Sequence, residues 1–377
     1  MAHLVAIHLP GGPAFVTALR REWEAGNAVL PVDRRLPAGA RRDLLSTMAP
    51  SVLVHEGGRQ HLAGGRDVEP GDALVVATSG STGTPKGVVL THDAVAASAA
   101  ATTRRLGITP ADTWLACLPL SHVGGLAVVT RALLTGTPLV VHDGFDAARV
   151  QAAAAEGVTA VSLVATALRR LEPTPFRVIV LGGARPPADR PPNCHTTYGL
   201  TETGSGVVYD GRPLDGVEVL VDTTGEILLR GPMLLRCYRD DTTPLDTDGW
   251  LHTGDLGGWL PDGRLQVHGR RGDLIITGGE NVWPEPVEAL LRTHERVADV
   301  AITGEPDPEW GQRVVAWVVP ADGAPTLAQL RAHLADSLPA FCAPKELRLV
   351  PSLPTTALGK VQRHLLSASG EGAQVSH

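Results

Sequence analysis

An apolar run followed by a glycine-rich polar loop is the feature that most restricts how this chain can fold. Residues 73–77 have the pattern of a buried strand, and residues 78–87 read Thr-Ser-Gly-Ser-Thr-Gly-Thr-Pro-Lys-Gly. Glycines let backbone N–H groups turn toward an anion, hydroxyls add donors, and a lysine adds a mobile positive charge. The loop therefore predicts an ATP-binding protein. Its candidate phosphate ligands are Thr78, Ser79, Gly80, Ser81, Thr82, Gly83 and Lys86.

The loop differs from the P-loop of many nucleotide-binding proteins in the residues beside its lysine. The P-loop places a glycine before the lysine and a Ser or Thr after it, and that hydroxyl binds Mg²⁺. Here Pro85 precedes Lys86 and Gly87 follows it. A magnesium ligand must therefore come from another part of the chain.

Length and patterning predict an α/β protein with more than one domain. A chain of 377 residues exceeds the ~250–300 residues at which a single core stops growing. Strand-like and helical patterns alternate up to about residue 181, which predicts mostly parallel, helix-covered sheets in a large N-terminal domain, residues 1–271. Short strands between about residues 206 and 268 predict a small β subdomain of that domain. Residues 273–366 predict a compact α+β lobe, and the Ser- and Gly-rich tail, residues 367–377, predicts disorder.

Charge, hydropathy and cysteine spacing argue against several classes of protein. A net charge of -7 and a pI near 6.0 give no overall attraction to nucleic acid or anionic membranes. There is no uninterrupted apolar run of about 18 residues and no basic N-terminal segment, so we expect a cytoplasmic protein without membrane insertion. The four scattered cysteines show no CxxC pattern, so neither a zinc site nor a disulfide framework is expected.

Four further segments, in order behind the phosphate loop, resemble the adenylate-forming superfamily of acyl-CoA synthetases, luciferases and peptide-synthetase adenylation domains. They are YGLTET at 198–203, TGD at 253–255, GRRGD with GGENV within 269–282, and PTTALGKVQR at 354–363. Each segment is weak alone, but together and in this order they cover nearly the whole chain. The resemblance implies a ligase that uses ATP, Mg²⁺ and CoA and has a small, mobile C-terminal lobe.

The resemblance also implies roles for single residues of the large domain. Tyr198 would stack on adenine, Thr201 would hydrogen-bond the α-phosphate, and Glu202 would be the missing Mg²⁺ ligand. A glycine pair would allow the backbone to approach the adenine and acyl groups closely. That segment is Gly182, Gly183 and Ala184.

Further implied roles fall on residues around and beyond the expected domain boundary. Asp255 would accept both ribose hydroxyls with Arg270 nearby, and Lys360 would bridge the substrate carboxylate and the α-phosphate as the adenylate forms. Gly272 stands where the superfamily has a polar hinge residue, and glycine absorbs a large φ/ψ change. Rotation there would withdraw Lys360 and bring residues 278–280 to the site for CoA transfer.

Two segments narrow the resemblance to short o-succinylbenzoate-CoA ligases of menaquinone synthesis. They are residues 118–126, in which His122 would line the acyl pocket, and residues 204–217. Polar groups near His122 and Ser205 would hold the second, unreacted carboxylate of such a substrate. Two alternatives stay open: a CoA ligase for another aryl or aliphatic acid, and a stand-alone adenylation enzyme that loads a carrier protein. The sequence also leaves open whether the chain forms a homodimer.

Overall fold

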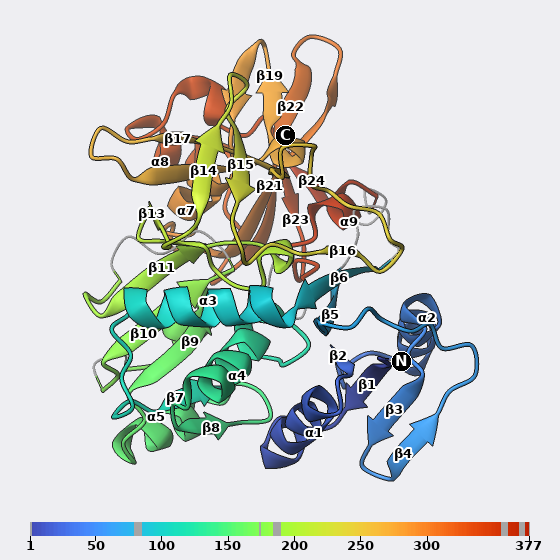
Figure 1. The fold of residues 1–377 in the computed structure, drawn as a ribbon. Coiled ribbons are helices and arrows are strands. Elements are labelled where there is room, and N and C mark those ends of the chain that lie inside the picture. Colours follow the sequence, from blue (N-terminus) through green and yellow to red (C-terminus); the bar gives the residue numbers. More distant parts are fainter. Residues whose placement is uncertain are drawn as a thin grey trace. The chain divides into compact units, whose positions relative to one another are not determined.

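The computed structural model describes residues 2–78, 85–172, 175–183, 190–355, 361–368 and 374–376, and Figure 1 colours the chain in sequence order. The chain divides into two compact units. The first unit comprises Met1–Leu220, Leu228–His252 and Trp259–Leu265. The second comprises Val221–Ile227, Thr253–Gly258 and Gln266–His377.

The first unit contains two seven-stranded sheets with parallel strands inside. Antiparallel pairing occurs at both edges of the first sheet and at one edge of the second. In the first sheet β1 (Leu4–His8) runs parallel to β2 (Ala28–Pro31) and β3 (Val52–His55), and β5 (Asp72–Thr78) runs parallel to β2. The antiparallel strands of this sheet are β4 (Gly58–His61), β6 (Lys86–Thr91) and β16 (Cys237–Tyr238).

The second sheet has the order β13-β12-β11-β10-β9-β7-β8. Its parallel strands are β7 (Trp114–Ala116), β8 (Leu139–Val141), β9 (Ala160–Val164), β10 (Val178–Gly182) and β11 (Cys194–Tyr198). Its antiparallel strands are β12 (Val208–Tyr209) and β13 (Arg212–Pro213). Short apolar strands of this kind are buried on both faces by helices.

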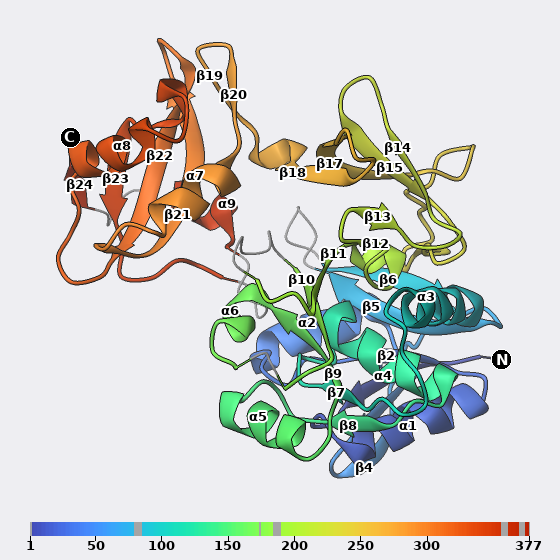
Figure 2. The same ribbon diagram turned by 90° about the vertical axis from the view of Figure 1, so that its left-hand side faces the viewer.

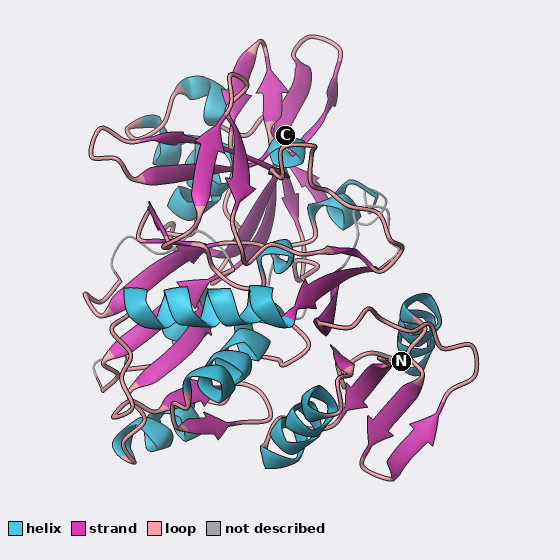
Figure 3. Ribbon diagram, viewed as in Figure 1, coloured by secondary structure: helices cyan, strands magenta, loops and turns pink. Residues whose placement is uncertain are grey.

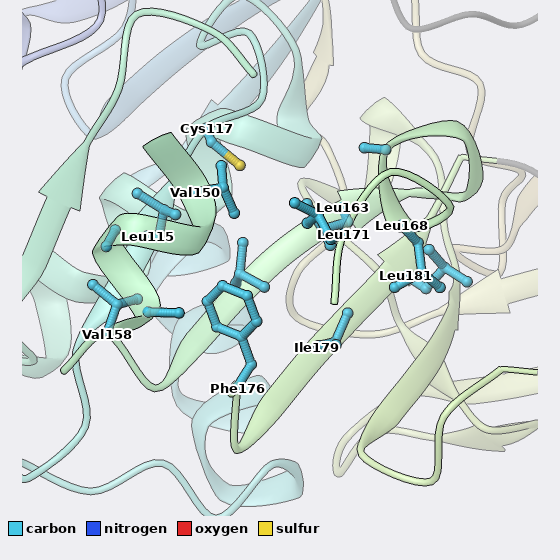
Figure 4. Close-up of a cluster of buried hydrophobic side chains, with 14 of the residues drawn as sticks. Leu115, Cys117, Val150, Val158, Leu163, Leu168, Leu171, Phe176, Ile179 and Leu181 are labelled. Carbon is cyan, nitrogen blue, oxygen red and sulfur yellow. The ribbon is translucent and has the colours of Figure 1, made fainter. Parts of the chain in front are cut away.

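Helices connect and cover these strands, as the colouring of Figure 3 shows. They are α1 (Pro13–Glu24), α2 (Ala38–Met48), α3 (His92–Arg105), α4 (Val123–Thr135), α5 (Ala147–Ala155) and α6 (Ala165–Leu168). Side-chain oxygens of Thr91 and Asp146 accept backbone N–H groups at the starts of α3 and α5, which satisfies groups without helical partners. Figure 4 shows one resulting core, where Val150 of α5 packs against Leu115, Leu163 and Ile179 of β7, β9 and β10.

The second unit is built around a six-stranded sheet in which β21 and β22 form a long antiparallel pair. Its strands are β19 (Ile275–Thr277), β20 (Glu280–Val282), β21 (Val297–Asp307), β22 (Gly311–Pro320), β23 (Glu346–Leu349) and β24 (Gln374–Ser376). Figure 2 shows the accompanying helices α7 (Pro284–Leu291), α8 (Leu327–Ala335) and α9 (Arg363–Ala368). Apolar residues of α7 and α8 pack on the sheet to form the core of this unit.

A four-stranded sheet occupies the region where a β subdomain is expected. Its order is β14 (Glu218–Val221), β15 (Glu226–Arg230), β17 (Leu251–Trp259) and β18 (Leu265–Arg270). The division between the two units passes through this sheet, whereas the sequence predicts a boundary at Gly272. That hinge position stays a prediction.

Two segments differ from their sequence-based expectations. The disorder expected for the tail is wrong for residues 374–376, because β24 pairs antiparallel with β23. An edge strand offers backbone hydrogen bonds to a short segment of almost any sequence. At the other end, no element was assigned to residues 1–12 from the sequence, and β1 lies there, buried between β2 and β3. Among the described residues, no helix is long and apolar enough to cross a membrane.

Candidate active site

The phosphate loop begins and ends at one place in the first sheet. Thr78 closes β5, Lys86 opens β6, and these two residues are paired in the antiparallel ladder. The Thr78 hydroxyl donates to the Lys86 carbonyl at 3.4 Å. The loop thus joins the antiparallel strands β5 and β6, and it begins at the carboxyl end of β5, which runs parallel to β2 on its other side. The ligands expected within it, Ser79, Gly80, Ser81, Thr82 and Gly83, lie outside the described residues.

Tyr238 contacts both Glu202, the expected metal ligand, and Lys86, the expected phosphate ligand. The sequence analysis did not identify Tyr238 as a site residue. Its hydroxyl donates to Oε1 of Glu202 at 3.0 Å. The Nζ atom of Lys86 lies over its ring, 4.8 Å from the centroid. A lone tyrosine between apolar and basic residues carries no motif, so its position follows only from the pairing of β16 with β6.

A short 3-10 turn, Thr201–Thr203, holds Glu202 and Thr201. The buried Thr203 hydroxyl accepts a hydrogen bond from Leu200 N and donates to Ser205 O at 2.6 Å. The Glu202 carbonyl accepts Leu235 N at 2.7 Å. The turn is therefore held by the Thr203 hydroxyl and by Leu235, and Glu202 is half-buried.

The residues around Glu202 fit a magnesium ion bound together with a nucleotide. No group of three or more His, Cys, Asp or Glu side chains that could hold a metal occurs in the part of the chain that the structure describes. Mg²⁺ is commonly held by one or two carboxylates and by phosphate oxygens of the substrate. A single carboxylate close to a phosphate loop suits this mode.

The expected adenine-side residues lie at the ends of two adjacent strands. Gly182 ends β10 and Tyr198 ends β11, and these strands run parallel. A Cβ atom on Gly182 would come within 2.9 Å of the Thr197 hydroxyl, and Gly183 has a φ of +85°. A side chain at Gly183 would therefore be strained, and one at Gly182 would force the Thr197 hydroxyl to shift. Ala184, the third residue of this expected segment, lies outside the described residues.

His122 precedes the first turn of α4 and faces the first sheet. Its Nε2 lies 3.9 Å from Oδ2 of Asp33, a residue just after β2, and has no hydrogen-bond partner among the described residues. Burial lowers the pKa of His122 below 6.5, with a smaller opposing effect from Asp33. A neutral ring at pH 7 can donate or accept one hydrogen bond.

Arg131 is a buried cation of α4 that the sequence analysis missed. The residue is 3% exposed, and its Nη2 donates to the Ser205 hydroxyl at 3.3 Å. Its guanidinium lies 5.0 Å from the ring centroid of Trp114, and Nε and Nη1 have no hydrogen-bond partner within the described ranges. Burial lowers the pKa of Arg131. A charged residue on the buried face of an Ala-, Val- and Leu-rich helix was the available signal.

A small cavity adjoins this arginine. Its volume is about 10 Å³, which is about the space of one water molecule. It lies between α3 and α4 and reaches the backbone of Gly204, next to Ser205. Its lining residues are Leu74, Val95, Ser98, Ala99, Val123, Leu126, Ala127, Thr130, Arg131 and Gly204.

The expected ribose residues are paired within the second unit. Nε of Arg270, at the end of β18, lies 3.0 Å from Oδ1 of Asp255 in β17. Asp255 is 7% exposed, and its backbone N–H donates to the Thr253 hydroxyl at 3.0 Å. Lys360 lies outside the described residues, but Thr355 and Val361 on either side of its loop form an antiparallel bridge.

Comparisons with known proteins find relatives along nearly the whole chain. The model of the AMP-binding enzyme family matches residues 63–239, and that of the AMP-binding enzyme C-terminal domain matches residues 286–360. A protein of Mycobacterium tuberculosis named probable 2-succinylbenzoate–CoA ligase is 39% identical over 96% of this chain and 97% of its own. A 2-succinylbenzoate–CoA ligase of Listeria monocytogenes is 35% identical over 78% of this chain and 69% of its own.

Solved structures with the same fold include two complexes of one enzyme, the o-succinylbenzoate CoA synthetase of Bacillus subtilis. The complex with its acyl-adenylate intermediate has a TM-score of 0.88 and 27% identity, and the match covers 100% of this chain and 89% of that chain. The complex with ATP and magnesium has a TM-score of 0.87 at 27% identity, covering 97% and 89%. The α/β fold with a large N-terminal and a small C-terminal domain is thus confirmed.

Proposed function

The chain belongs to the AMP-binding enzyme family, and on this premise we propose that it ligates 2-succinylbenzoate (o-succinylbenzoate) to CoA in menaquinone synthesis. It is an AMP-forming acid–thiol ligase that uses ATP, Mg²⁺ and CoA. Its curated relatives carry the 2-succinylbenzoate–CoA ligase name. Small-molecule substrates fit such an enzyme, and a cytoplasmic location and a homodimer remain proposals.

The reaction would proceed in two balanced steps. A carboxylate oxygen of the succinyl arm forms a bond to the α-phosphorus of ATP, and the bond to the bridging oxygen breaks to release pyrophosphate. The thiol sulfur of CoA then forms a bond to the acyl carbon, the thiol proton passes to solvent, and AMP leaves. Both steps depend on positioning and on charge neutralisation.

Within the first step, we assign a task to each candidate site residue. Thr78 and Lys86 hold phosphate oxygens, and Thr201 hydrogen-bonds the α-phosphate. Tyr198 stacks on adenine, beside the glycines at the end of β10. A bound Mg²⁺, held by Glu202, would neutralise charge on the phosphates. Asp255 and Arg270 of the second unit would receive the ribose hydroxyls, and Lys360 would stabilise the transition state.

The single observation that carries the choice of substrate is the guanidinium of Arg131. A buried arginine is costly unless a negative group or several acceptors compensate it, and among the described residues it has one serine oxygen and an aromatic ring beside it. The ring carboxylate of 2-succinylbenzoate is an acceptor of the required charge and can take two N–H groups at once. His122, the residue before α4, would line the acyl pocket.

The substrate assignment is tested by removing the ring carboxylate from the substrate. We expect kcat/KM for 2-succinylbenzoate to exceed that for benzoylpropionate, the same skeleton without this carboxylate, by about 10²- to 10⁴-fold, because the analogue leaves the buried guanidinium unpaired. CoA-dependent release of AMP measures both. Equal use of the two acids would identify a general aryl-acid CoA ligase, and release of AMP only with a carrier protein would identify an adenylation enzyme.

The metal role of Glu202 is tested by Glu202→Gln. The amide keeps the shape of the side chain but loses the charge that a hard cation prefers. We expect the magnesium concentration for half-maximal turnover to rise about tenfold, with a melting temperature close to that of the wild type. A magnesium titration that the substitution leaves unchanged would place the metal ligand elsewhere.

A further inference from the structure

We propose that Tyr238 is a positioning residue that holds both the magnesium ligand Glu202 and the phosphate-loop lysine, Lys86. The proposal rests on the ATP and Mg²⁺ roles given above and not on the identity of the acid. Its basis is one side chain that contacts both groups through different parts. The hydroxyl donates to Glu202 Oε1 at 3.0 Å, and the ring face lies 4.8 Å from Lys86 Nζ.

The backbone under Tyr238 is fixed on both sides. Cys237 and Tyr238 pair with Val89 and Val88 of β6. The N–H of Arg239 donates to Gly87 O at 2.7 Å, immediately after Lys86. If β16 shifts, β6, the strand that begins at Lys86, therefore shifts with it. Tyr238 thus has a defined position relative to the end of the phosphate loop.

The side chain of Arg239 adds a second anchor. It is 6% exposed, and its guanidinium donates to the carbonyls of Met48 at 3.0 Å, Asp67 at 2.8 Å, and Arg66. Three backbone acceptors from two segments of the first unit compensate the buried charge. This clamp holds the residue next to Tyr238 against the first sheet, and it uses no group of the active site.

The two contacts of Tyr238 have separate physical effects. A phenol that donates to one carboxylate oxygen limits rotation of Glu202, and the charge of that carboxylate strengthens the hydrogen bond. The ring face attracts the ammonium of Lys86 while leaving its N–H groups available for phosphate oxygens. Tyr238 would thus preorganise the carboxylate for metal and the lysine for phosphate before ATP arrives.

Substitutions can separate these effects because phenylalanine keeps the ring. In the presence of Mg²⁺, we expect Tyr238→Phe to weaken ATP binding by about 5- to 20-fold, because the variant loses a hydrogen bond to a charged group. In EDTA, we expect its ATP affinity to stay within about twofold of the wild type. Tyr238→Leu also removes the ring, and we expect it to weaken binding in EDTA as well, by about three- to fivefold. Calorimetric titration of ATP, at several Mg²⁺ concentrations and in EDTA, measures both without turnover.

A double-mutant cycle shows whether the hydroxyl acts through Glu202. In a Glu202→Gln background, Tyr238→Phe is expected to change Mg²⁺-dependent ATP affinity by less than about twofold. Tyr209→Phe is a matched control, because it also removes a tyrosine hydroxyl of the first unit, a buried one that donates to Thr102 and not to Glu202. We expect the ATP affinity of this variant to equal that of the wild type. The same loss in both backgrounds, or wild-type Mg²⁺ dependence in Tyr238→Phe, would overturn the proposal.

This test is independent of the choice of acid, since no carboxylic acid is present in the titrations. If 2-succinylbenzoate proves not to be the substrate while the cycle gives the expected coupling, the positioning role stands and the proposed substrate falls. If ATP binding shows no Mg²⁺ dependence in the wild type, the metal assignment of Glu202 falls together with the role of Tyr238.

Discussion

Replacing Lys360 with alanine is expected to lower the rate of acyl-adenylate formation by about two to three orders of magnitude, while thioester formation from preformed adenylate stays within about threefold of the wild type. Removing one charged group that stabilises a transition state commonly has an effect of this size. The second step develops no new charge on the phosphorus. Isotope exchange between pyrophosphate and ATP measures the first step, and mixing synthetic acyl-adenylate with CoA measures the second.

Described residues before and after Lys360 make defined contacts. The N–H of Gln362 donates to Pro354 O at 2.8 Å, so the segments before and after the lysine are joined. Arg363 is held by Glu288 at 2.7 Å and by Asp273 at 3.4 Å. These ion pairs join Arg363 to α7 and to the residue after Gly272.

Lys360→Arg is the matched variant for this prediction, because it retains the charge but changes its geometry. We expect it to recover only part of the first-step rate, since a planar guanidinium does not replace a compact ammonium at a fixed point. Equal losses in both half-reactions of Lys360→Ala would show that the residue is structural.

Short motifs in the sequence predicted which of the candidate site residues lie close together, and their roles in a site stay predictions. Glu202 and Thr201 lie in one turn, and Arg270 contacts Asp255. The alternation of strand-like and helical patterns similarly predicted helix-covered sheets, and α3, α4 and α5 each bury an apolar face. Local patterns suffice where local interactions decide the structure.

The sequence did not predict residues whose positions depend on long-range pairing. Tyr238 is brought to Lys86 by the pairing of β16 with β6, and Arg131 meets Ser205 across the interior of the first unit. Neither residue belongs to a motif, and neither partner lies nearby in the sequence. The strand β1 was also missed, since a five-residue apolar run is too short to distinguish a strand from other buried segments.

Arg131→Met is expected to remove the preference for the ring carboxylate. Methionine fills a similar space without charge, so the carboxylate of 2-succinylbenzoate would enter an apolar pocket unpaired. We expect kcat/KM for 2-succinylbenzoate to fall by about 10²-fold or more, and kcat/KM for benzoylpropionate to stay within about threefold of the wild type. The ratio of the two values therefore approaches one, and AMP release with each acid measures it.

Stability distinguishes this loss of specificity from damage to the fold. Burying an arginine with few acceptors destabilises the fold. Its replacement by an apolar side chain is therefore expected to leave the free energy of unfolding unchanged or to raise it by up to about 1–3 kcal/mol, and the melting temperature should follow. Binding of 2-succinylbenzoate, in turn, should raise the melting temperature of the wild type but not of the variant. A variant that is destabilised, and that loses activity equally with both acids, would mean that Arg131 supports the packing of α4 against Trp114 and does not bind the substrate.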